Sequence, residues 1–329
     1  MKIAFAGTPR FGALVLGALL RSSHEVVLVL TQPDRPAGRG RRERFSAVKE
    51  LAVQEGLRVE QPEKASDREV LDLARSLGAR ALTIAAFGQI LKSPLLGGIQ
   101  CINVHASLLP KYRGAAPIER AIMDGEGVTG VSIMEVEPAL DTGPVFLQRA
   151  VLIEKEDDAG SMYAKLGEAG GEALAEVLEA IEAGGMEPRR QDDRGATYAE
   201  KITPHDMRID WSEQAWRCAA RVRALSPHIG AFTEVPVRGQ AQAAKGGKRG
   251  GEAGAGGASG SLRLKVWKAI VAEGGGEPGR VRTLDERLLV ACGTGTLELL
   301  EVQPPGKRRM SAAEFLRGYG RLVNKRSLA

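Results

Sequence analysis

The chain has 329 residues, of which 43% are hydrophobic and 26% are charged. These fractions are typical of globular proteins, so they exclude global disorder, and the length leaves room for two ordinary domains. The opening residues lack the cationic, then apolar pattern of a signal peptide. No apolar run approaches the roughly 18 residues needed to span a bilayer. We therefore expect a cytoplasmic protein without a membrane-spanning segment.

The net charge of +5 is unevenly distributed along the chain. Residues 1–183 hold 21 Lys and Arg against 25 Asp and Glu, a net of −4. Residues 184–329 hold 25 against 16, a net of +9. A basic half is typical of proteins that bind a polyanion, although a solvated lysine- and arginine-rich surface gives the same count.

The three cysteines, Cys101, Cys218 and Cys292, are far apart and form no CxxC pair. This spacing argues against a disulfide scaffold and against a zinc site built on cysteine. Because free cysteine behaves as a small apolar residue, we expect all three side chains to be buried. No HExxH motif or Cys/His cluster occurs, so we also expect no metal site.

Strand-like and helical patterns alternate through the first half. Thr8 and Pro9 fit an N-cap followed by proline at the first helical position, opening a helix that runs to Leu20. Further helices are predicted at 46–55, 68–77, 118–123 and 161–183. Short apolar runs predict strands at 2–6, 26–30, 81–86, 101–104, 130–136 and 145–151. This alternation indicates a mostly parallel sheet with helices on both faces, in a domain spanning 1–183.

The second half of the sequence has a different pattern of predicted elements. Residues 184–208 show no period, and we interpret them as the connection to a domain at 209–329. A helix at 212–225, capped by Ser212, is followed by short strands at 231–237, 262–270, 288–291 and 296–303, and by a helix at 311–322. Residues 239–261 are rich in Gly and Ala and predict a spacer, unless their lysines and arginine contact nucleic acid. Together these elements favour a small antiparallel barrel.

Polar side chains follow two predicted strands, and ligands of open parallel sheets gather at such ends. Asn103 and His105 are two residues apart, so on an extended segment they share one face, and Asp141 follows the strand at 130–136. An amide that donates to an oxyanion, an imidazole that relays a proton, and a carboxylate that fixes the imidazole are suited to acyl transfer onto an amine. Each residue taken singly also fits a surface or turn position.

Two glycine- or arginine-rich loops remain. The turn at 7–12 lacks both GxGxxG and the Lys-Ser/Thr of a P-loop, which argues against a nicotinamide dehydrogenase. The loop at 31–44 carries five arginines, and its prolines and glycines exclude a regular helix. It suits phosphate-backbone contact, or else it is a solvated loop. The five arginines are Arg35, Arg39, Arg41, Arg42 and Arg44.

The segment CINVHASLLPKYRGAAPIERAI at 101–122 resembles the signature of folate-dependent formyltransferases. Four further segments resemble the members that act on methionyl-tRNA: AGTPRFG at 6–12, TQPDRPAGRG at 31–40, GVSIMEVEPALDTGPV at 130–145 and KVWKA at 265–269. The resemblance implies a Rossmann-like domain followed by a small OB-like barrel that holds tRNA. It also implies 10-formyltetrahydrofolate as donor and initiator methionyl-tRNA as acceptor, and we expect a monomer.

The resemblance also implies roles for individual residues. The catalytic trio would be Asn103, His105 and Asp141. The folate would be contacted by Ser107, Leu108, Leu109 and Pro110, and by Phe87, Gln89 and Leu91. The acceptor end of the tRNA would be read by Arg39, Arg41 and Arg42.

The chain departs from the family pattern in its second half. Pro227 is followed by His228 and Ile229 where a Trp-Pro pair is usual, and the loop at 239–261 is long. Both departures concern how tRNA is held. Two rival interpretations stay open: a formyltransferase for a small-molecule amine, and a nucleic-acid-binding protein whose enzyme domain is inactive.

Overall fold

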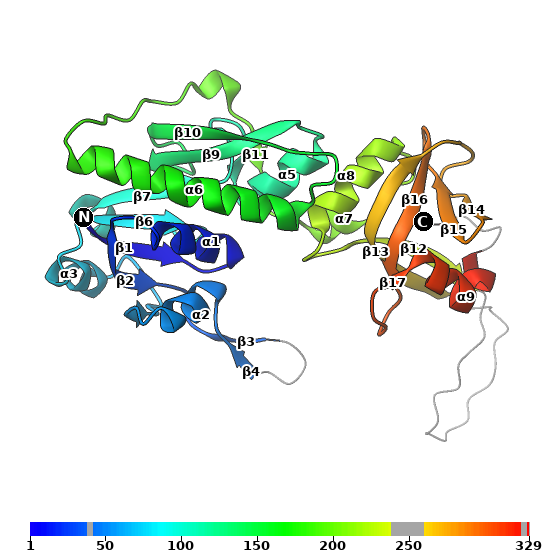
Figure 1. Cartoon of the computed structure of the whole chain (residues 1–329), viewed down its shortest axis with the longest axis horizontal. Coiled ribbons are helices and arrows are strands. Elements are labelled where there is room, and N and C mark those ends of the chain that lie inside the picture. The colour runs from blue at the N-terminus through cyan, green and yellow to red at the C-terminus, as the bar shows by residue number, and fades with distance from the viewer. Residues whose placement is uncertain (38–41, 238–259, 324–327, 329) are drawn as a thin grey trace, which may run out of the picture. The chain divides into compact units, whose positions relative to one another are not determined.

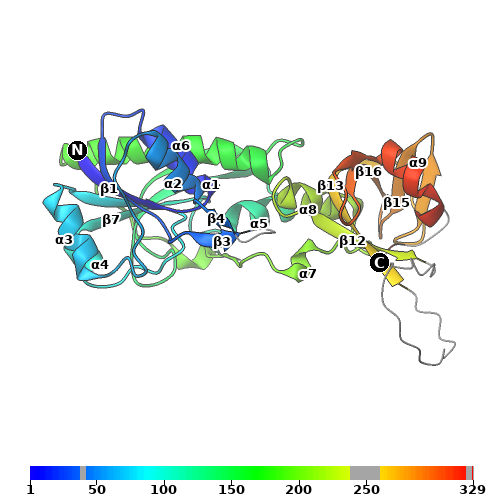
Figure 2. The same ribbon diagram turned by 90° about the horizontal axis from the view of Figure 1, so that it is seen from below.

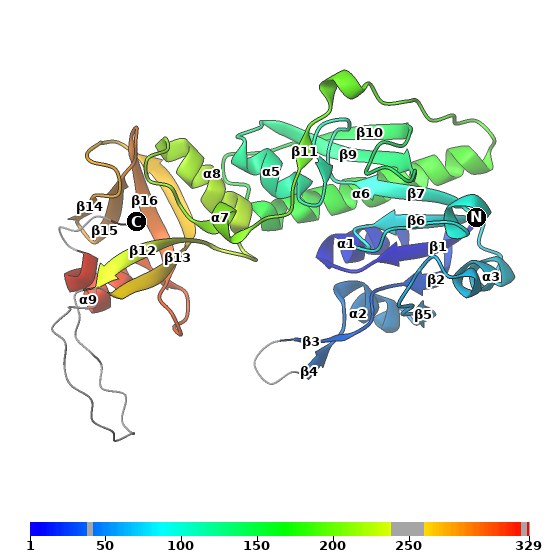
Figure 3. The ribbon, with the colours of Figure 1, turned by 180° about the vertical axis from the view of Figure 1, so that it is seen from behind.

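The structure, a computed structural model, describes residues 1–37, 42–237, 260–323 and 328. Its larger sheet has seven strands in the order β10-β9-β7-β6-β1-β2-β5, which Figure 3 shows from one edge to the other. The five strands from β7 to β5 run parallel, while β9 is antiparallel to β7 and β10 to β9. Their bounds are β1 Lys2–Gly7, β2 Glu25–Leu30, β5 Val59–Glu60, β6 Ala81–Ala85, β7 Gln100–His105, β9 Val128–Glu135 and β10 Val145–Leu152. The expected mostly parallel sheet is therefore confirmed.

Helices cover both faces of this sheet (Figure 2). One face carries α1 (Arg10–Leu19), α2 (Ala47–Gln54) and the long α6 (Ala159–Glu182), and the other carries α3 (Arg68–Ser76) and α4 (Leu95–Gly98). The apolar runs read along β1 and β2 reflect this double coverage, because both faces of each strand are buried. Gly171 of α6 lets that helix lie against α1, since an added Cβ would meet the Cβ of Ala18 at 2.3 Å.

Two predicted helix starts were wrong. Pro9, not Thr8, is the N-cap of α1, and the Thr8 hydroxyl instead donates to the Phe87 carbonyl at 2.8 Å. The helix predicted from Ser212 begins at Ala215, because the Ser212 hydroxyl donates to Asp210 at 2.6 Å and holds a turn. In both cases the hydroxyl has a longer-range or turn partner that sequence spacing does not show.

The segment that follows α6 packs against the domain that contains the seven-stranded sheet. β11 (Tyr198–Ala199) pairs in parallel with β8 (Arg113–Gly114), and Val145 and Arg189 exchange backbone hydrogen bonds of 2.8 Å. The chain divides into two compact units, the first of Met1–Ala121 with Glu126–Lys201 and the second of Ile122–Gly125 with Ile202–Ala329. The helix α5, Pro117–Met123, contributes to both.

The second unit is built on an antiparallel sheet in the order β12-β13-β16-β15-β14, with β17 paired to β16 (Figure 1). Its strands are β12 Ala231–Val237, β13 Gly260–Ala272, β14 Val281–Leu284, β15 Arg287–Ala291, β16 Thr296–Gln303 and β17 Met310–Ser311. Helices α7 (Pro204–Met207), α8 (Ala215–Leu225) and α9 (Ala312–Val323) complete it. Trp211, Val222 and Phe315 lie in its apolar core, so a separate antiparallel unit is confirmed.

Several short elements were not predicted, including β5, β8, β11, β14 and β17, because two to four residues carry too little periodicity to detect. A two-strand hairpin, β3 (Arg35–Ala37) with β4 (Arg42–Arg44), lies within the arginine loop. The three cysteines are buried, as expected. Most of the Gly/Ala-rich segment, 238–259, lies outside the described residues. Within the described chain, none of the helices combines the length and apolar character that a membrane span requires.

Candidate active site

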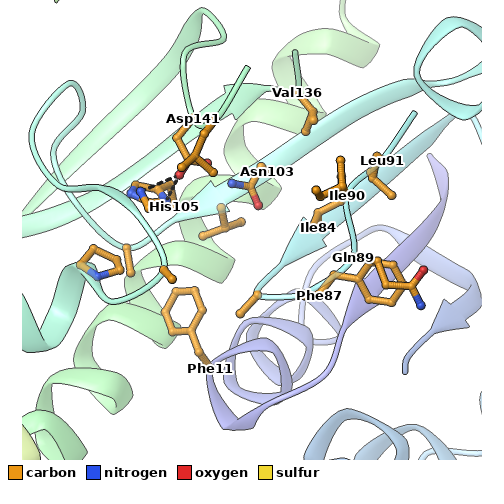
Figure 4. Close-up of a pocket in the computed structure, with 18 of the residues that line it drawn as sticks. Phe11, Ile84, Phe87, Gln89, Ile90, Leu91, Asn103, His105, Val136 and Asp141 are labelled. Carbon is orange, nitrogen blue, oxygen red and sulfur yellow. Dashed lines mark hydrogen bonds and ion pairs between the residues drawn. The ribbon is translucent and has the colours of Figure 1, made fainter. Parts of the chain in front are cut away.

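A cavity of about 640 Å³ opens at the carboxyl ends of β1, β6 and β7. β2 lies on one side of β1 and β6 on the other, so the chain leaves β1 in one direction and later returns on its other side. Such a switch point leaves a crevice beyond the strand ends, because neighbouring connections diverge there. Asn103, His105 and Asp141 all line this cavity (Figure 4).

The imidazole of His105 is held at both of its nitrogens. Its side chain is 6% exposed, and Nε2 lies 2.8 Å from the Tyr112 carbonyl oxygen. A carbonyl only accepts, so Nε2 carries the proton. Nδ1 lies 3.7 Å from Oδ2 of Asp141, a separation that forms an ion pair when the ring is charged. Each nitrogen of the ring therefore faces a protein oxygen, which fixes the orientation of the imidazole.

Asn103 lies two residues before His105 on β7, with its side chain directed into the cavity (Figure 4). On the neighbouring strand β6, the hydroxyl of Thr83 donates a hydrogen bond to the Ala4 carbonyl at 3.0 Å. Within the described residues, the Asn103 amide makes no hydrogen bond. An amide donor left without a protein partner at a cavity wall is available to a bound molecule.

Asp141 reaches His105 by a route that the sequence did not indicate. β9 is antiparallel to β7, so its last residue, Glu135, pairs with Ile102 near the beginning of β7. The chain then returns through an excursion that is closed by the 2.9 Å hydrogen bond from the Glu135 amide to the Pro144 carbonyl. The meeting of Asp141 and His105 therefore depends on this loop and not on two parallel strand ends.

The segment from Ser107 to Pro110 does not line the cavity. Ser132 holds the backbone of this segment, because its hydroxyl donates to the Ser107 carbonyl at 2.7 Å and accepts from the Leu109 amide at 3.0 Å. The side chain of Leu108 lies against Gly130. The four residues predicted to contact folate are thus buried in or packed on the scaffold behind His105.

Phe87, Gln89 and Leu91 do line the cavity, at the end away from His105 (Figure 4). The side-chain amide of Gln89 is engaged elsewhere, since it accepts from the Ala65 amide at 2.8 Å and donates to the Pro62 carbonyl at 3.1 Å. Its role in the described residues is to hold this wall in place. The wall offers apolar side chains and backbone groups to a flat ring.

A buried carboxyl group lies in another part of the same cavity. Glu119 accepts a 2.9 Å hydrogen bond from the hydroxyl of Tyr163, whose ring packs edge-on against Phe11. Burial raises the pKa of Glu119, and the smaller effects of its hydrogen bonds and of Arg120 lower it. A raised pKa in the folded chain means that Glu119 contributes its stability while protonated and loses it as pH rises through the folded value.

Replacing Glu119 with glutamine is therefore expected to raise Tm near pH 7. The amide keeps an oxygen for the Tyr163 hydroxyl and removes the buried charge. The gain should shrink as the pH falls below the ordinary pKa of a glutamate, where the native side chain is already neutral. Thermal unfolding at pH 4 and pH 7 measures this, with the exposed Glu63→Gln as control. An equal Tm difference at both pH values would contradict the assignment.

The comparisons with known proteins identify the fold and the family. Residues 1–178 match the formyl transferase family, and residues 201–320 match its C-terminal domain. A methionyl-tRNA formyltransferase of Methylococcus capsulatus is 40% identical over 330 residues, covering 99% of each chain. One of Methylobacterium sp. is 42% identical over 320 residues, covering 97% of this chain and 96% of the relative. The chain belongs to the methionyl-tRNA formyltransferase family.

Solved structures share the fold of this chain at low identity. HypX from Aquifex aeolicus in complex with tetrahydrofolic acid aligns with a TM-score of 0.62 at 17% identity, covering 99% of this chain and 48% of that one. An N-formyltransferase of Helicobacter canadensis aligns with a TM-score of 0.61 at 16% identity, covering 92% and 99%. The family and the two kinds of domain that the motifs implied are thus confirmed.

The arginine loop of this family member is anchored at its base. Lys49 of α2 pairs with Asp34 and donates to Gln61 at 2.6 Å, and Gln61 donates to Asp34 at 3.0 Å. Arg42 lies in β4. Arg39 and Arg41 lie outside the described residues. These contacts fix the base of the loop at Asp34.

Proposed function

We propose that this chain transfers the formyl group of 10-formyltetrahydrofolate to the α-amino group of initiator methionyl-tRNA. The observation that carries the proposal is the match of about 40% identity to methionyl-tRNA formyltransferases along 99% of the chain. The cavity supports it, because an amide, an imidazole and a carboxylate line one space. A folate-type donor is consistent with the formyl transferase domain that the first unit matches.

In the proposed mechanism, the acceptor nitrogen bonds to the formyl carbon and the bond to N10 of the folate breaks. The acceptor ammonium gives up two protons, of which N10 takes one and solvent the other. Negative charge builds on the formyl oxygen in between, and the Asn103 amide donates to it. The charged His105 ring stabilises the same oxygen, while Asp141 at 3.7 Å balances the ring charge. The substrate amine is itself the nucleophile, so no seryl or cysteinyl nucleophile is required.

The cavity suits two substrates that approach the trio from different sides. We assign the pterin ring to the apolar wall that contains Phe87 and Leu91, with Gln89 holding that wall. Ser107 to Pro110 support the strand end that carries His105 rather than lining the cavity. The aminoacyl group would then occupy the part of the cavity near Phe11 and Tyr163.

The second unit offers a surface for the tRNA backbone. The guanidinium of Arg309 lies 3.5 Å from the ring centroid of Trp267, and Nζ of Lys265 lies 5.0 Å from it. Burial lowers the pKa of Lys265, and the charges of Arg309 and Arg263 lower it further. Cations gathered this closely repel one another, and a phosphate backbone relieves that repulsion. This cluster supports the proposal that the basic second half contacts tRNA.

A transfer assay tests the proposal directly. The enzyme is mixed with 10-formyltetrahydrofolate and methionyl initiator tRNA, and formylmethionine is measured. Elongator methionyl-tRNA and small amines, such as a nucleotide-linked amino sugar, are tested in parallel. We expect formylation of the initiator tRNA above all others. Transfer to a small amine alone would support the rival formyltransferase, and tRNA binding without transfer would support an inactive enzyme domain.

Replacing Arg39 with alanine is expected to raise KM for methionyl-tRNA and leave KM for the folate donor unchanged. If Arg39 neutralises one phosphate, the slope of log affinity against log salt should fall by about 1. Kinetics at several salt concentrations measure both effects. Arg58→Ala is the matched control, because Arg58 is exposed and pairs with Glu60 outside the loop. Unchanged tRNA kinetics would remove Arg39 from the tRNA contacts.

We also propose that the enzyme acts as a cytoplasmic monomer, because its acceptor is charged tRNA and the site residues named above come from one chain. Light scattering at working concentration tests the monomer. A dimeric mass would overturn it.

A further inference from the structure

The loop that carries Asp141 has features that make its position costly to maintain. Asp141 has a φ of +52°, in the left-handed region that non-glycine residues rarely adopt. Gly143 lies so close to β9 that an added Cβ would be 1.9 Å from the Glu135 carbonyl oxygen. Residues 137–140 are exposed. A loop of this kind needs contacts from elsewhere to hold one conformation.

Gln191 supplies such contacts from 50 residues further along the chain. Its Nε2 donates to the carbonyl oxygens of Asp141 and Gly143, both at 2.8 Å. One side-chain amide thus joins the two backbone groups that flank the turn at Thr142. The carboxylate of Asp141 is fixed separately, because Oδ2 accepts from the Gly114 amide at 2.8 Å.

The orientation of the Gln191 amide is set by Arg113. The Nε and Nη2 of Arg113 donate to Oε1 of Gln191 at 3.1 and 2.7 Å, and Nη2 also donates to Asp193 at 2.7 Å. A guanidinium has only donors, so the oxygen of Gln191 must face it and the NH₂ group must face the loop. The Arg113 side chain itself is buried, at 3% exposed, although its partner Asp193 is 80% exposed.

The same short segment also holds His105. Tyr112, Arg113 and Gly114 are consecutive: the first accepts from His105, the second orients Gln191, and the third donates to Asp141. Backbone groups of Tyr112 and Gly114 therefore hold both members of the His–Asp pair. A shift of the Asp141 loop would change the 3.7 Å separation without moving His105.

We propose that Gln191 is a positioning residue for Asp141, which it holds in line with His105 through the carbonyls of Asp141 and Gly143. The proposal rests on the proposed function, in which Asp141 supports the charged imidazole. It assigns a role in the active site to the segment between the two expected domains. Gln191 does not line the cavity and acts only through the loop.

A double-mutant cycle tests the proposal on the full-length enzyme. Gln191→Ala is expected to lower kcat by about 10- to 100-fold, the cost of misplacing a catalytic group by about 1 Å. KM for the folate donor should not change. In an Asp141→Ala background the same substitution should change kcat by less than about 2-fold, because the group that it positions is gone. Single-turnover rates in the four proteins measure the coupling.

A second variant separates positioning from folding. Gln191→Glu keeps an oxygen for Arg113 but replaces the two N–H donors with an oxygen that faces two carbonyls. It should lower kcat at least as much as alanine, and it carries the same cycle if the alanine variant does not fold. Gln54→Glu, an exposed site on α2 with the same change of charge, should keep normal turnover.

The outcomes distinguish this inference from the proposed function. Losses that multiply fully in the double mutant would show that Gln191 does not act through Asp141. Normal kcat in both Gln191 variants would overturn the inference alone. Normal kcat in Asp141→Ala would remove Asp141 from the catalytic trio, and the positioning role would fall with it.

Discussion

Replacing His105 with alanine should lower kcat by about 10²–10³-fold, the usual loss when one group that stabilises an oxyanion is removed. The ring is fixed by the Tyr112 carbonyl at 2.8 Å and faces Asp141, so in the proposed mechanism it meets the reacting oxygen without rearrangement. KM for the folate donor should stay within about 2-fold, because the imidazole acts on the transition state and does not bind the donor in the ground state. Steady-state kinetics with both substrates measure the split.

His205→Ala serves as the matched control, because that histidine is exposed on α7 and we assign it no role. The Tm of both variants should be compared, because His105→Ala has two structural costs. It leaves a small space beneath Asp141, and it leaves the Tyr112 carbonyl without its hydrogen-bond donor. A normal kcat in a folded His105→Ala enzyme would remove the imidazole from the chemistry. A loss confined to KM would make it a binding residue.

The sequence predicted the parts of the site that follow from local geometry. Asn103 and His105 share a face because residues two apart on a strand do so, and that holds in β7. The cavity lies where strand ends of a parallel sheet diverge, as expected. Both inferences depend on a single strand and its immediate neighbours, and periodicity in the sequence reports such arrangements directly.

The position of Asp141 shows where local reasoning fails. The sequence predicts that its strand ends beside the carboxyl end of β7, but β9 is antiparallel and ends at the opposite end of the sheet. The residue still faces His105, because the chain returns through the loop that Gln191 and Gly114 hold. Strand direction depends on how the chain crosses over, and apolar runs carry no record of it.

The residues that support the site had no signal in the sequence at all. Gln191 lies in a stretch without periodicity, and its partners are backbone carbonyls 48 and 50 residues away. Tyr112 acts through its carbonyl, so its side chain gives no indication of the contact with His105. Contacts made to backbone by a distant segment can be read only from the folded chain.

Replacing Asn103 with aspartate should produce the other large effect, a loss of kcat of at least about 10²–10³-fold. The two side chains have nearly the same shape, but a carboxylate only accepts hydrogen bonds and brings a negative charge to the place where the formyl oxygen becomes negative. Asn103→Ala removes the donor without adding charge, so it should lose less. The order of the two rates therefore reports charge on the reacting oxygen and not merely space.

The structural cost of these changes should be small, because the Asn103 amide has no hydrogen-bond partner within the described residues that either substitution would break. Single-turnover formyl transfer gives the rates, and folate binding measured by fluorescence verifies that the cavity still forms. Gln54→Glu, which adds the same charge at an exposed position, controls for net charge. If aspartate at this position were as active as alanine, the oxygen would carry no appreciable charge in the step that limits the reaction, and Asn103 would be holding the substrate instead.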